Sequence, residues 1–243
     1  MEARNIAFYK FVLIDNPQTL CEKLGQVIRS LGLKGTLLIA TEGINGMLSG
    51  LDENIRNFEK ELKKDPRFSD ILIKVSYSKK IPFQRLRVKV KSEVLTLGLK
   101  EIDPTQESMP YIKPQELKDA LDQGEDLVLV DVRNDFEVNY GTFKGAINPG
   151  TKSFSQFPEF AKNLKVEKKR RIVTFCTAGI RCEKGALILK NAGFKNVFQL
   201  EGGILEYFSS NKGAPHFSGK CFVFDERELL NADLQPDSEG DWD

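Results

Sequence analysis

Residues 171–184 have the sequence RIVTFCTAGIRCEK, a short apolar run that ends in a cysteine and is followed by a small, glycine-containing loop. The run Arg171–Cys176 predicts a buried strand. Two further apolar runs, Leu127–Val132 and Asn196–Leu200, predict strands in the same region, and helical segments alternate with them. Strands that alternate with helices predict a parallel sheet, and ligands bind at the carboxyl edge of such sheets. We therefore expect Cys176 to lie at that edge. The other elements predicted here are a short strand at Ala146–Asn148 and helices at Pro158–Leu164 and Glu183–Ala192.

The residues after the cysteine have the composition of an anion-binding loop. Cys176 precedes the N-terminus of a predicted helix, where unpaired N–H groups and the helix dipole favour a thiolate. Gly179 and its small neighbours allow successive N–H groups to point inward, and Arg181 adds a positive charge. We expect Cys176 to be the catalytic nucleophile. The predicted anion loop comprises Thr177, Ala178, Gly179, Ile180 and Arg181.

The position of the arginine separates two kinds of cysteine chemistry. Arg181 follows Cys176 by five residues, whereas cysteine phosphatases place their arginine one residue further along, in a wider loop. The tighter loop favours a smaller group on sulfur, such as a persulfide or an oxidised sulfur. The next residue is Cys182. It is either a resolving thiol that forms a transient disulfide with Cys176 or a small residue packed behind the loop.

The first part of the chain follows a different pattern. Its predicted elements run strand, helix, strand, strand, helix, strand, with one added strand, which is the order of a ferredoxin-like α+β sandwich. Asp52 is predicted to cap the second helix. Thr41–Gly46 is predicted to be a loop, either a tight turn or a segment that approaches substrate or the cysteine loop of the second domain. The predicted strands are Asn5–Ile14, Lys34–Ala40, Gly46–Ser49, Ile71–Tyr77 and Arg85–Lys91.

The 243 residues are predicted to form four parts. Residues 1–95 form the α+β domain and residues 96–110, polar with two prolines, form a linker. Residues 111–215 form the α/β domain with the parallel sheet, and residues 216–243 form an acidic extension. The net charge of +1 hides an asymmetry, because residues 1–100 carry 18 Lys or Arg against 11 Asp or Glu. Such a bias is typical of a surface that faces an anion, although a solvated charged surface also produces it.

One segment of the first domain is strongly basic. Ile71–Ser92 contains seven lysines and arginines, Lys74 among them, and no acidic residue. Every second residue from Arg85 to Lys91 is basic, so these four side chains lie on one face of a strand. A basic face with Tyr77 and Phe83 nearby can bind RNA phosphates and stack bases, but a solvated outer face has the same pattern. The candidate RNA-binding residues are Lys79, Lys80, Arg85, Arg87, Lys89 and Lys91.

The composition also argues against several other classes of protein. No apolar run reaches the roughly 18 residues of a membrane helix, and no signal peptide follows the N-terminus, so we expect a cytoplasmic protein. The cysteines are few and contain no CxxC pair, and His216 is the single histidine. These features argue against a disulfide framework and a zinc site, and no flavin or nicotinamide motif is present. The four cysteines are Cys21, Cys176, Cys182 and Cys221.

Several motifs place the second domain in a known group. Residues 109–210 resemble a rhodanese, or sulfurtransferase, domain, and the resemblance implies a rhodanese-like α/β fold with a parallel sheet. Thr142-Phe143 departs from the pattern, because rhodaneses usually carry His-Ile there. The resemblance implies that Asp131 and Arg133 form a structural ion pair, with a similar role for Glu137. The matching stretches are Leu129–Arg133, Glu137, Gly141–Pro149, the loop from Cys176 and Leu200–Ile204.

Together with Thr41–Gly46 and Gly219–Arg227, these motifs resemble the bacterial tRNA uridine hydroxylase family over nearly the whole chain. The resemblance implies hydroxylation of the wobble uridine to 5-hydroxyuridine with molecular oxygen, and contact of the basic face with the anticodon stem-loop. Cys176 would add to C6 of the uracil or carry an oxidised sulfur. Family members usually continue into a cysteine-rich segment, so the resemblance also implies a truncated chain.

Two other functions stay open from the sequence. The first is a thiosulfate or persulfide sulfurtransferase, in which the basic domain is incidental. The second is an RNA-binding protein with a vestigial rhodanese fold, against which the intact loop from Cys176 to Arg181 counts. The sequence predicts neither an oligomeric state nor the reductant.

Overall fold

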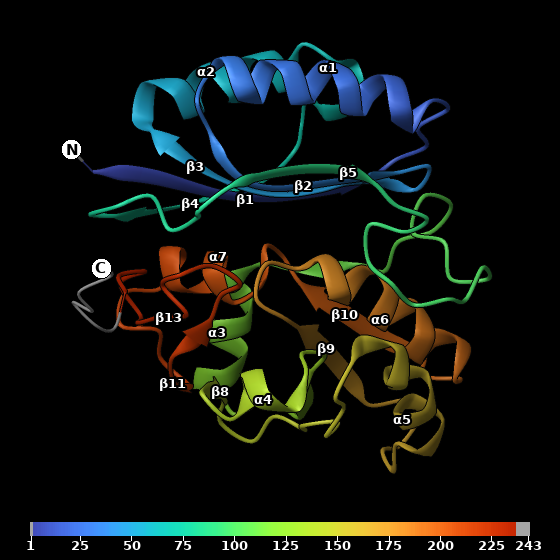
Figure 1. Cartoon of the computed structure of the whole chain (residues 1–243). Coiled ribbons are helices and arrows are strands. Elements are labelled where there is room, and N and C mark those ends of the chain that lie inside the picture. The colour runs from blue at the N-terminus through green and yellow to red at the C-terminus, as the bar shows by residue number, and fades with distance from the viewer. Residues whose placement is uncertain (1, 237–243) are drawn as a thin grey trace. The chain divides into compact units, whose positions relative to one another are not determined.

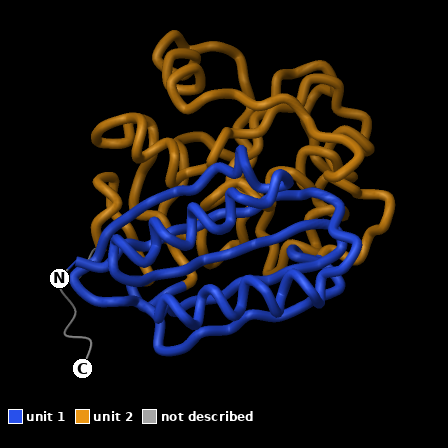
Figure 2. The backbone as a smooth tube through the Cα atoms, turned by 90° about the horizontal axis from the view of Figure 1, so that it is seen from above, with its two compact units in different colours: residues 1–96, 225–227 blue, residues 97–224, 228–243 orange. Residues whose placement is uncertain are grey.

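The computed structural model describes residues 2–236, and these form two compact units (Figures 1 and 2). The first unit contains the described residues up to Thr96 together with Asp225–Arg227, and the second contains Leu97–Phe224 and the described residues from Glu228 onward. The acidic extension predicted for residues 216–243 lies partly outside the described residues. Among the described residues, no helix is long and apolar enough to span a membrane.

The first unit is a five-stranded sheet in the order β4-β1-β3-β2-β5, with helices α1 and α2 covering one face (Figure 1). Strand β1 pairs antiparallel with β3 and β4, β2 pairs antiparallel with β3, and β5 is added parallel to β2. This confirms the ferredoxin-like order with an added strand. The elements are β1 (Ala3–Phe11), α1 (Pro17–Ser30), β2 (Lys34–Ala40), β3 (Gly43–Leu51), α2 (Asp52–Lys63), η1 (Pro66–Phe68), β4 (Ile73–Ser78) and β5 (Leu86–Val90).

The core of the first unit lies between the sheet and the two helices. Leu24 and Ile28 of α1 and Phe58 of α2 are buried against the sheet, as the helical spacing of apolar residues requires. Asn16 caps α1, because its side-chain oxygen accepts a hydrogen bond from the Thr19 N–H at 3.1 Å. The sequence therefore forms this sandwich through ordinary amphipathic patterning and one local cap.

Two local predictions in this unit need corrected bounds. The predicted loop Thr41–Gly46 is a turn at Thr41 and Glu42 only, because Gly43 already begins β3. Gly43 has φ +146°, and a Cβ there would lie 2.0 Å from the Lys10 carbonyl oxygen, so the close strand pairing requires glycine. Asp52 is the first residue of α2 rather than its cap, which is Leu51.

The second unit is built on a four-stranded parallel sheet in the order β6-β10-β9-β7. This confirms the α/β class with a parallel sheet. Its elements are β6 (Tyr111–Ile112), α3 (Pro114–Asp122), β7 (Leu127–Asp131), α4 (Asp135–Val138), β8 (Gly141–Phe143), η2 (Phe154–Gln156), α5 (Phe157–Asn163), β9 (Arg171–Phe175), α6 (Ile180–Asn191), β10 (Asn196–Leu200), α7 (Gly203–Ser210), β11 (Phe217–Gly219), β12 (Cys221–Phe222) and β13 (Leu229–Leu230).

Three predictions for this unit are corrected. The strand expected at Ala146–Asn148 is a single bridge between Ile147 and Val130, and β8 pairs with β11 instead. Strand β9 ends at Phe175, so Cys176 is the first residue after the strand. Helix α6 begins at Ile180 rather than Glu183, which places Arg181 in its first turn.

Candidate active site

Cys176 lies at the carboxyl end of β9, an inner strand of the parallel sheet, and its side chain is completely buried. The chain then turns through Gly179, which caps α6 with φ +101°. The Gly179 N–H donates to Cys176 Sγ at 3.1 Å. Glycine is needed here because a residue with a Cβ rarely adopts the left-handed conformation in which the chain turns from the loop into α6.

The carbonyl groups of the loop are held away from the sulfur by α7. The Ile204 N–H donates to the Cys176 carbonyl oxygen at 2.9 Å, and the Leu205 N–H donates to that of Thr177 at 3.0 Å. Gly203 makes this approach possible, because it has φ +68° and a Cβ there would lie 2.4 Å from the Cys176 oxygen. The loop therefore presents N–H groups to the sulfur while its carbonyl groups bond elsewhere.

These contacts produce a stable thiolate. Burial alone would raise the pKa of Cys176, but other groups outweigh it and lower that pKa to about 6. They are a hydrogen bond from the Cys182 side chain, the positive charge of Arg181, and the N–H groups of Arg181 and Gly179. Burial and the neighbouring thiolate raise the pKa of Cys182 well above its ordinary value. At neutral pH, Cys176 is therefore the thiolate and Cys182 the protonated donor beside it.

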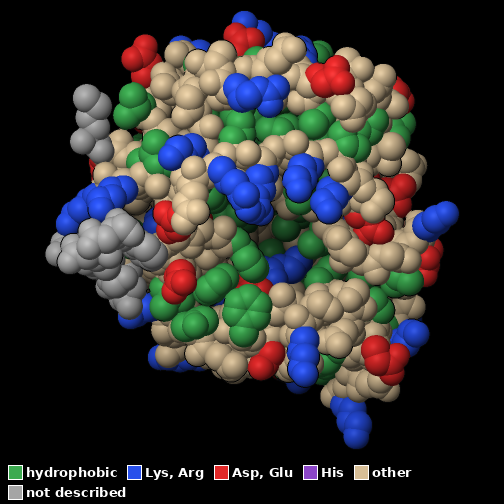
Figure 3. Space-filling model, viewed as in Figure 1, with side chains coloured by type: hydrophobic (Ala, Val, Ile, Leu, Met, Phe, Trp, Pro, Cys, Tyr) green, Lys and Arg blue, Asp and Glu red, His purple; other side chains and the backbone are tan. Residues whose placement is uncertain are grey.

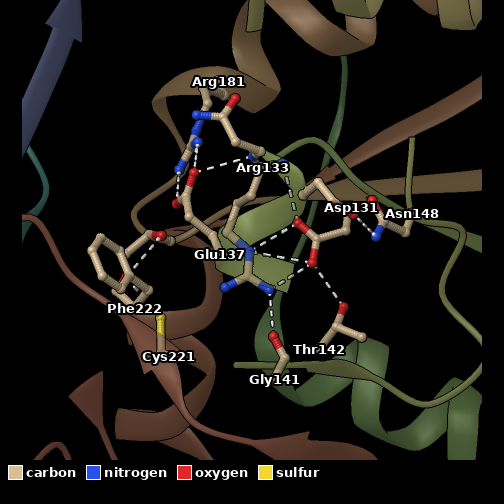
Figure 4. A network of polar contacts seen from close by, with 12 residues as sticks. Asp131, Arg133, Glu137, Gly141, Thr142, Asn148, Arg181, Cys221 and Phe222 are labelled. Atoms are coloured by element: carbon tan, nitrogen blue, oxygen red, sulfur yellow. Dashed lines mark hydrogen bonds and ion pairs between the residues drawn. The ribbon is translucent and has the colours of Figure 1, made fainter. Parts of the chain in front are cut away.

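The Arg181 guanidinium forms a buried ion pair with Glu137. Its two terminal nitrogens lie 2.6 and 2.8 Å from the Glu137 carboxylate oxygens (Figure 4). Burial alone would lower the pKa of Arg181, but the bonds to Glu137 raise it. Arg181 is 7% exposed and Glu137 is fully buried. The Glu137 carboxylate thus balances the charge of Arg181. The backbone N–H group of Arg181 contacts the sulfur, while its guanidinium is bound to Glu137.

A second buried ion pair lies near the pair of Arg181 and Glu137 (Figure 4). Arg133 donates to Asp131 through Nε at 2.9 Å and through Nη2 at 2.6 Å, and neither side chain is exposed (Figure 4). Arg133 Nη2 also donates to the Gly141 carbonyl oxygen at 2.6 Å. Thr142, which replaces the histidine usual in rhodaneses, donates its hydroxyl to Asp131 at 2.7 Å. This pair joins β7 to β8, whereas Glu137 belongs to the separate pair with Arg181.

The other titratable candidates have different surroundings. Burial raises the pKa of Cys221 to about 12 and also raises that of Cys21. His216 Nε2 lies 2.6 Å from Asp122 Oδ1, and neither residue belongs to the loop from Cys176 to Arg181. All four cysteines lie within the described residues, and Cys176 alone has a lowered pKa. Residues 2–236 contain no group of three or more His, Cys, Asp or Glu side chains placed to hold a metal.

The six candidate RNA-binding residues lie on the first unit, and all are exposed. Leu86 and Val88 of β5 pack against the core, whereas Arg85, Arg87, Lys89 and Lys91 are exposed. Figure 3, which has the same view as Figure 1, shows lysines and arginines gathered at the height where Figure 1 draws β5. Lys79 and Lys80 are exposed beyond the end of β4. Lys74 does not belong to this face, because it is buried and its amine lies 4.6 Å from the centre of the Tyr9 ring.

Sequence reasoning missed three features of the site. It did not predict that Glu137 pairs with Arg181, and it gave Gly203 no role. It also missed an aromatic cluster beside the loop, formed by Phe136, Tyr140, Phe222 and Phe224. The Gly202-Gly203 pair, which immediately follows the predicted strand Asn196–Leu200 and Glu201, was the one available signal, because paired glycines indicate close backbone approach. The other contacts join residues far apart in sequence.

The fold and the site define a protein with an acylphosphatase-like first domain and a rhodanese domain that holds a cysteine thiolate. Two family models agree: UPF0176 acylphosphatase like domain at residues 3–94 and Rhodanese-like domain at residues 113–210. A tRNA uridine(34) hydroxylase of Acaryochloris marina is 45% identical over 97% of this chain and 76% of its own length. One of Cupriavidus necator is 44% identical over 97% of this chain and 86% of its own length. The chain belongs to the tRNA uridine(34) hydroxylase family.

Among solved structures, the rhodanese-like domain of a protein from Anabaena sp. is similar to part of the chain. Its solution structure has a TM-score of 0.39 and 24% identity. The match covers 46% of this chain and 80% of the Anabaena domain.

Proposed function

We propose that this chain hydroxylates C5 of the wobble uridine of tRNA, with molecular oxygen as co-substrate and Cys176 as the reacting group. The observation that carries the proposal is the 44–45% identity to tRNA uridine(34) hydroxylases over 97% of the chain, which includes both units. The thiolate of Cys176, with a pKa of about 6, is the reactive group that the second unit offers to such a substrate.

The two neighbouring cysteines can supply the electrons that this reaction needs. Hydroxylation by O2 places one oxygen atom on C5 and releases the other as water, which consumes two electrons and two protons. In our proposal, Cys176 and Cys182 give up these electrons and protons and become a disulfide. An external dithiol then reduces the disulfide and restores the pair. The hydrogen bond between the two side chains supports this role, because it keeps Cys182 within reach of Cys176.

The burial of the sulfur bears on what Cys176 carries. Addition of the thiolate to C6 of the uracil would bring a whole ring to a side chain that is 0% exposed. An oxygen adduct on the sulfur requires less movement of the surrounding residues. When this adduct of O2 passes one oxygen atom to C5, the other stays on Cys176 as a sulfenate, which condenses with the Cys182 thiol to give the disulfide and water. The site therefore favours an oxidised sulfur on Cys176, cradled by the N–H groups of Gly179 and Arg181, over a covalent bond to the base.

We place the RNA backbone on the first unit. Its exposed β5 side chains form a row of like charge, and such a row binds phosphates in a salt-dependent way. The substrate portion is the anticodon stem-loop, because it carries the wobble uridine. The tRNA-binding residues in this proposal are Lys79, Lys80, Arg85, Arg87, Lys89 and Lys91.

Single-turnover chemistry tests the proposal directly. Fully reduced protein is mixed with unmodified tRNA and ¹⁸O₂ without any reductant, and the nucleosides and cysteines are analysed by mass spectrometry. We expect no more than one 5-hydroxyuridine per protein, with one labelled oxygen, and a matching amount of Cys176–Cys182 disulfide. Cys176→Ser and Cys182→Ser should give no product, whereas Cys21→Ser, which changes a thiol outside the site, should match the wild type.

The same assay identifies the alternative function. If the wild type forms no 5-hydroxyuridine with or without reductant, yet transfers sulfur from thiosulfate to a thiol acceptor, the chain is a sulfurtransferase. If product forms with full yield in Cys182→Ser, the electrons come from elsewhere and the role of the cysteine pair is wrong.

A further inference from the structure

Four aromatic residues gather on the surface of the second unit; we call them the aromatic shelf: Phe136, Tyr140, Phe222 and Phe224. Phe222 lies at the centre, with ring centroids 5.1 Å from Phe136, 5.7 Å from Tyr140 and 5.2 Å from Phe224. The three outer residues are also exposed, with Phe136 at 43%, Tyr140 at 47% and Phe224 at 54%. Figure 3 shows hydrophobic side chains gathered on the surface of this unit. Large exposed apolar clusters of this kind mark binding sites.

The shelf is attached to the catalytic loop at three points. The Thr177 hydroxyl donates to the Phe222 carbonyl oxygen at 3.4 Å, next to Cys176 in the chain. The Arg181 guanidinium lies 6.0 Å from the centre of the Phe224 ring. Helix α4 presents Phe136 to solvent while its neighbour Glu137 pairs with Arg181 inside. Figure 4 shows Phe222 beside the Glu137–Arg181 pair. The shelf is therefore the rim of the site, not a distant patch.

We propose that the aromatic shelf stacks an unpaired nucleobase of the tRNA that neighbours the uridine to be hydroxylated. This inference rests on the proposed function and adds the subsite that holds the substrate next to Cys176. Exposed rings bind splayed, unpaired bases by stacking, and single-stranded loops are where RNA offers such bases. A base held on the rim brings the adjacent nucleotide to the loop. The occupant is thus a loop nucleobase, while β5 holds phosphates.

The test is a double-mutant cycle on binding. The full chain is titrated into two fluorescent anticodon stem-loop RNAs, one intact and one abasic at both nucleotides flanking the target uridine. Phe224→Ala should weaken binding of the intact RNA by about 5- to 150-fold, as expected for one stacked base. The abasic RNA should bind the wild type more weakly by a similar factor. It should bind Phe224→Ala with little further loss, because both changes remove the same contact.

Further variants separate stacking from simple apolar burial. Phe224→Trp should keep the affinity, and Phe224→Leu, which retains apolar area without a ring, should lose most of it. Leu72→Ala removes a side chain that is 43% exposed in the first unit and should leave the affinity unchanged. Phe136→Ala and Tyr140→Ala extend the map. Phe224 is the most exposed shelf residue, so its variants remain usable if another variant does not fold.

The outcomes distinguish failure of the stacking inference from failure of the proposed function. Equal losses from the abasic change in wild type and Phe224→Ala would overturn the stacking inference, as would unchanged affinity in Phe224→Leu. A wild-type dimer in sedimentation that Phe224→Ala converts to a monomer would assign the shelf to a second copy of the chain instead. If the wild type makes no 5-hydroxyuridine, the proposed function fails. If it does, and Phe224→Ala keeps full affinity and rate, the shelf alone fails.

Discussion

The Cys176 loop and the basic face of β5 are two candidate sites built in opposite ways. The loop sets the pKa of one buried thiol through N–H groups, a neighbouring thiol and an ion pair, all enclosed in the second unit. The β5 face consists of exposed cations in the first unit, each carried by alternation along a strand. Contacts in the loop depend on one another because they share the same few atoms. Charges on β5 each contact a ligand through a separate exposed side chain, so the loss of one leaves the others in place.

The comparison teaches where each site is vulnerable. A single atom in the wrong place can dismantle the loop, because the interior is closely packed and its polar groups have no alternative partners. Losing one cation from β5 should weaken RNA binding only several-fold and leave the fold intact. Substitutions in the two regions should therefore differ in both the size and the kind of their effects.

Gly203→Ala should have the largest effect. The added Cβ would meet the Cys176 carbonyl oxygen at 2.4 Å, so α7 would have to move away and release the carbonyl groups of the loop. We expect a loss of at least about 4 kcal/mol in the free energy of unfolding, measured with urea, and loss of the thiolate. Gly213→Ala is the matched control, because Gly213 has φ +73° but nothing within 4 Å of its Cβ position. It should cost only about 1 kcal/mol of backbone strain. Similar losses in both variants would show that the contact at Gly203 is unimportant.

Glu137→Gln should come next. It leaves the buried Arg181 guanidinium without a countercharge, which should cost about 3 kcal/mol of unfolding free energy. Loss of the negative charge also exposes the Cys176 thiolate to the full positive charge of Arg181, so the pKa of Cys176 should fall below about 6. Titration of thiolate absorbance, corrected with Cys176→Ser, measures this shift. Glu159→Gln, an exposed change on α5, should alter neither quantity. A rise in the pKa of Cys176 would contradict this account of the charges.

On β5, Arg87→Gln combined with Lys89→Gln should weaken tRNA binding by about tenfold at moderate salt. The slope of log affinity against log salt should become shallower by about one for each phosphate that is no longer neutralised, while the unfolding free energy stays constant. The matched control is Lys60→Gln with Lys63→Gln, which removes the same charge from α2 on the other face of the sheet. If both pairs change the slope equally, the RNA does not select the β5 face.

Cys182→Ala should have the smallest effect on stability and on the thiolate, although without the second thiol it should give no product in the single-turnover assay. It removes the hydrogen bond that helps to hold the thiolate, so the pKa of Cys176 should rise from about 6 by up to about one unit. Because the thiolate is lost as pH falls through its pKa, the absorbance titration should move to higher pH. An unchanged midpoint would mean that the N–H groups and Arg181 suffice by themselves.

The sequence predicted best those elements whose residues carry the whole signal locally. Strands β2 and β10 have the predicted bounds, Lys34–Ala40 and Asn196–Leu200, because apolar runs between turn residues define them. The placement of Cys176 at the carboxyl end of a central strand followed from the same kind of run, although the strand ends one residue earlier than predicted. The field around a cysteine at the start of a helix is equally local, since it arises from the backbone.

Features that depend on distant pairing were missed or wrong. Strand β8 is defined by its pairing with β11, Phe217–Gly219, so its own short sequence gives little indication of a strand. The apolar segment Ala146–Asn148 was predicted as a strand but finds a single bridge. Glu137 and Arg181 are 44 positions apart, and no periodicity links them. Such contacts depend on the tertiary structure and leave no local signal in the sequence.

The position and charge of strand β5 also affect aggregation of the protein. Among the described residues, β5 is one of the two edge strands of the first sheet, and its far side has no neighbouring strand in that sheet. Edge strands of this kind are where separate molecules join sheets and aggregate, and charged side chains along them discourage it. The exposed Arg87 and Lys89 would repel the same residues of an approaching copy. Removing these charges should therefore lower the highest concentration at which the protein stays monomeric, whatever their effect on RNA binding.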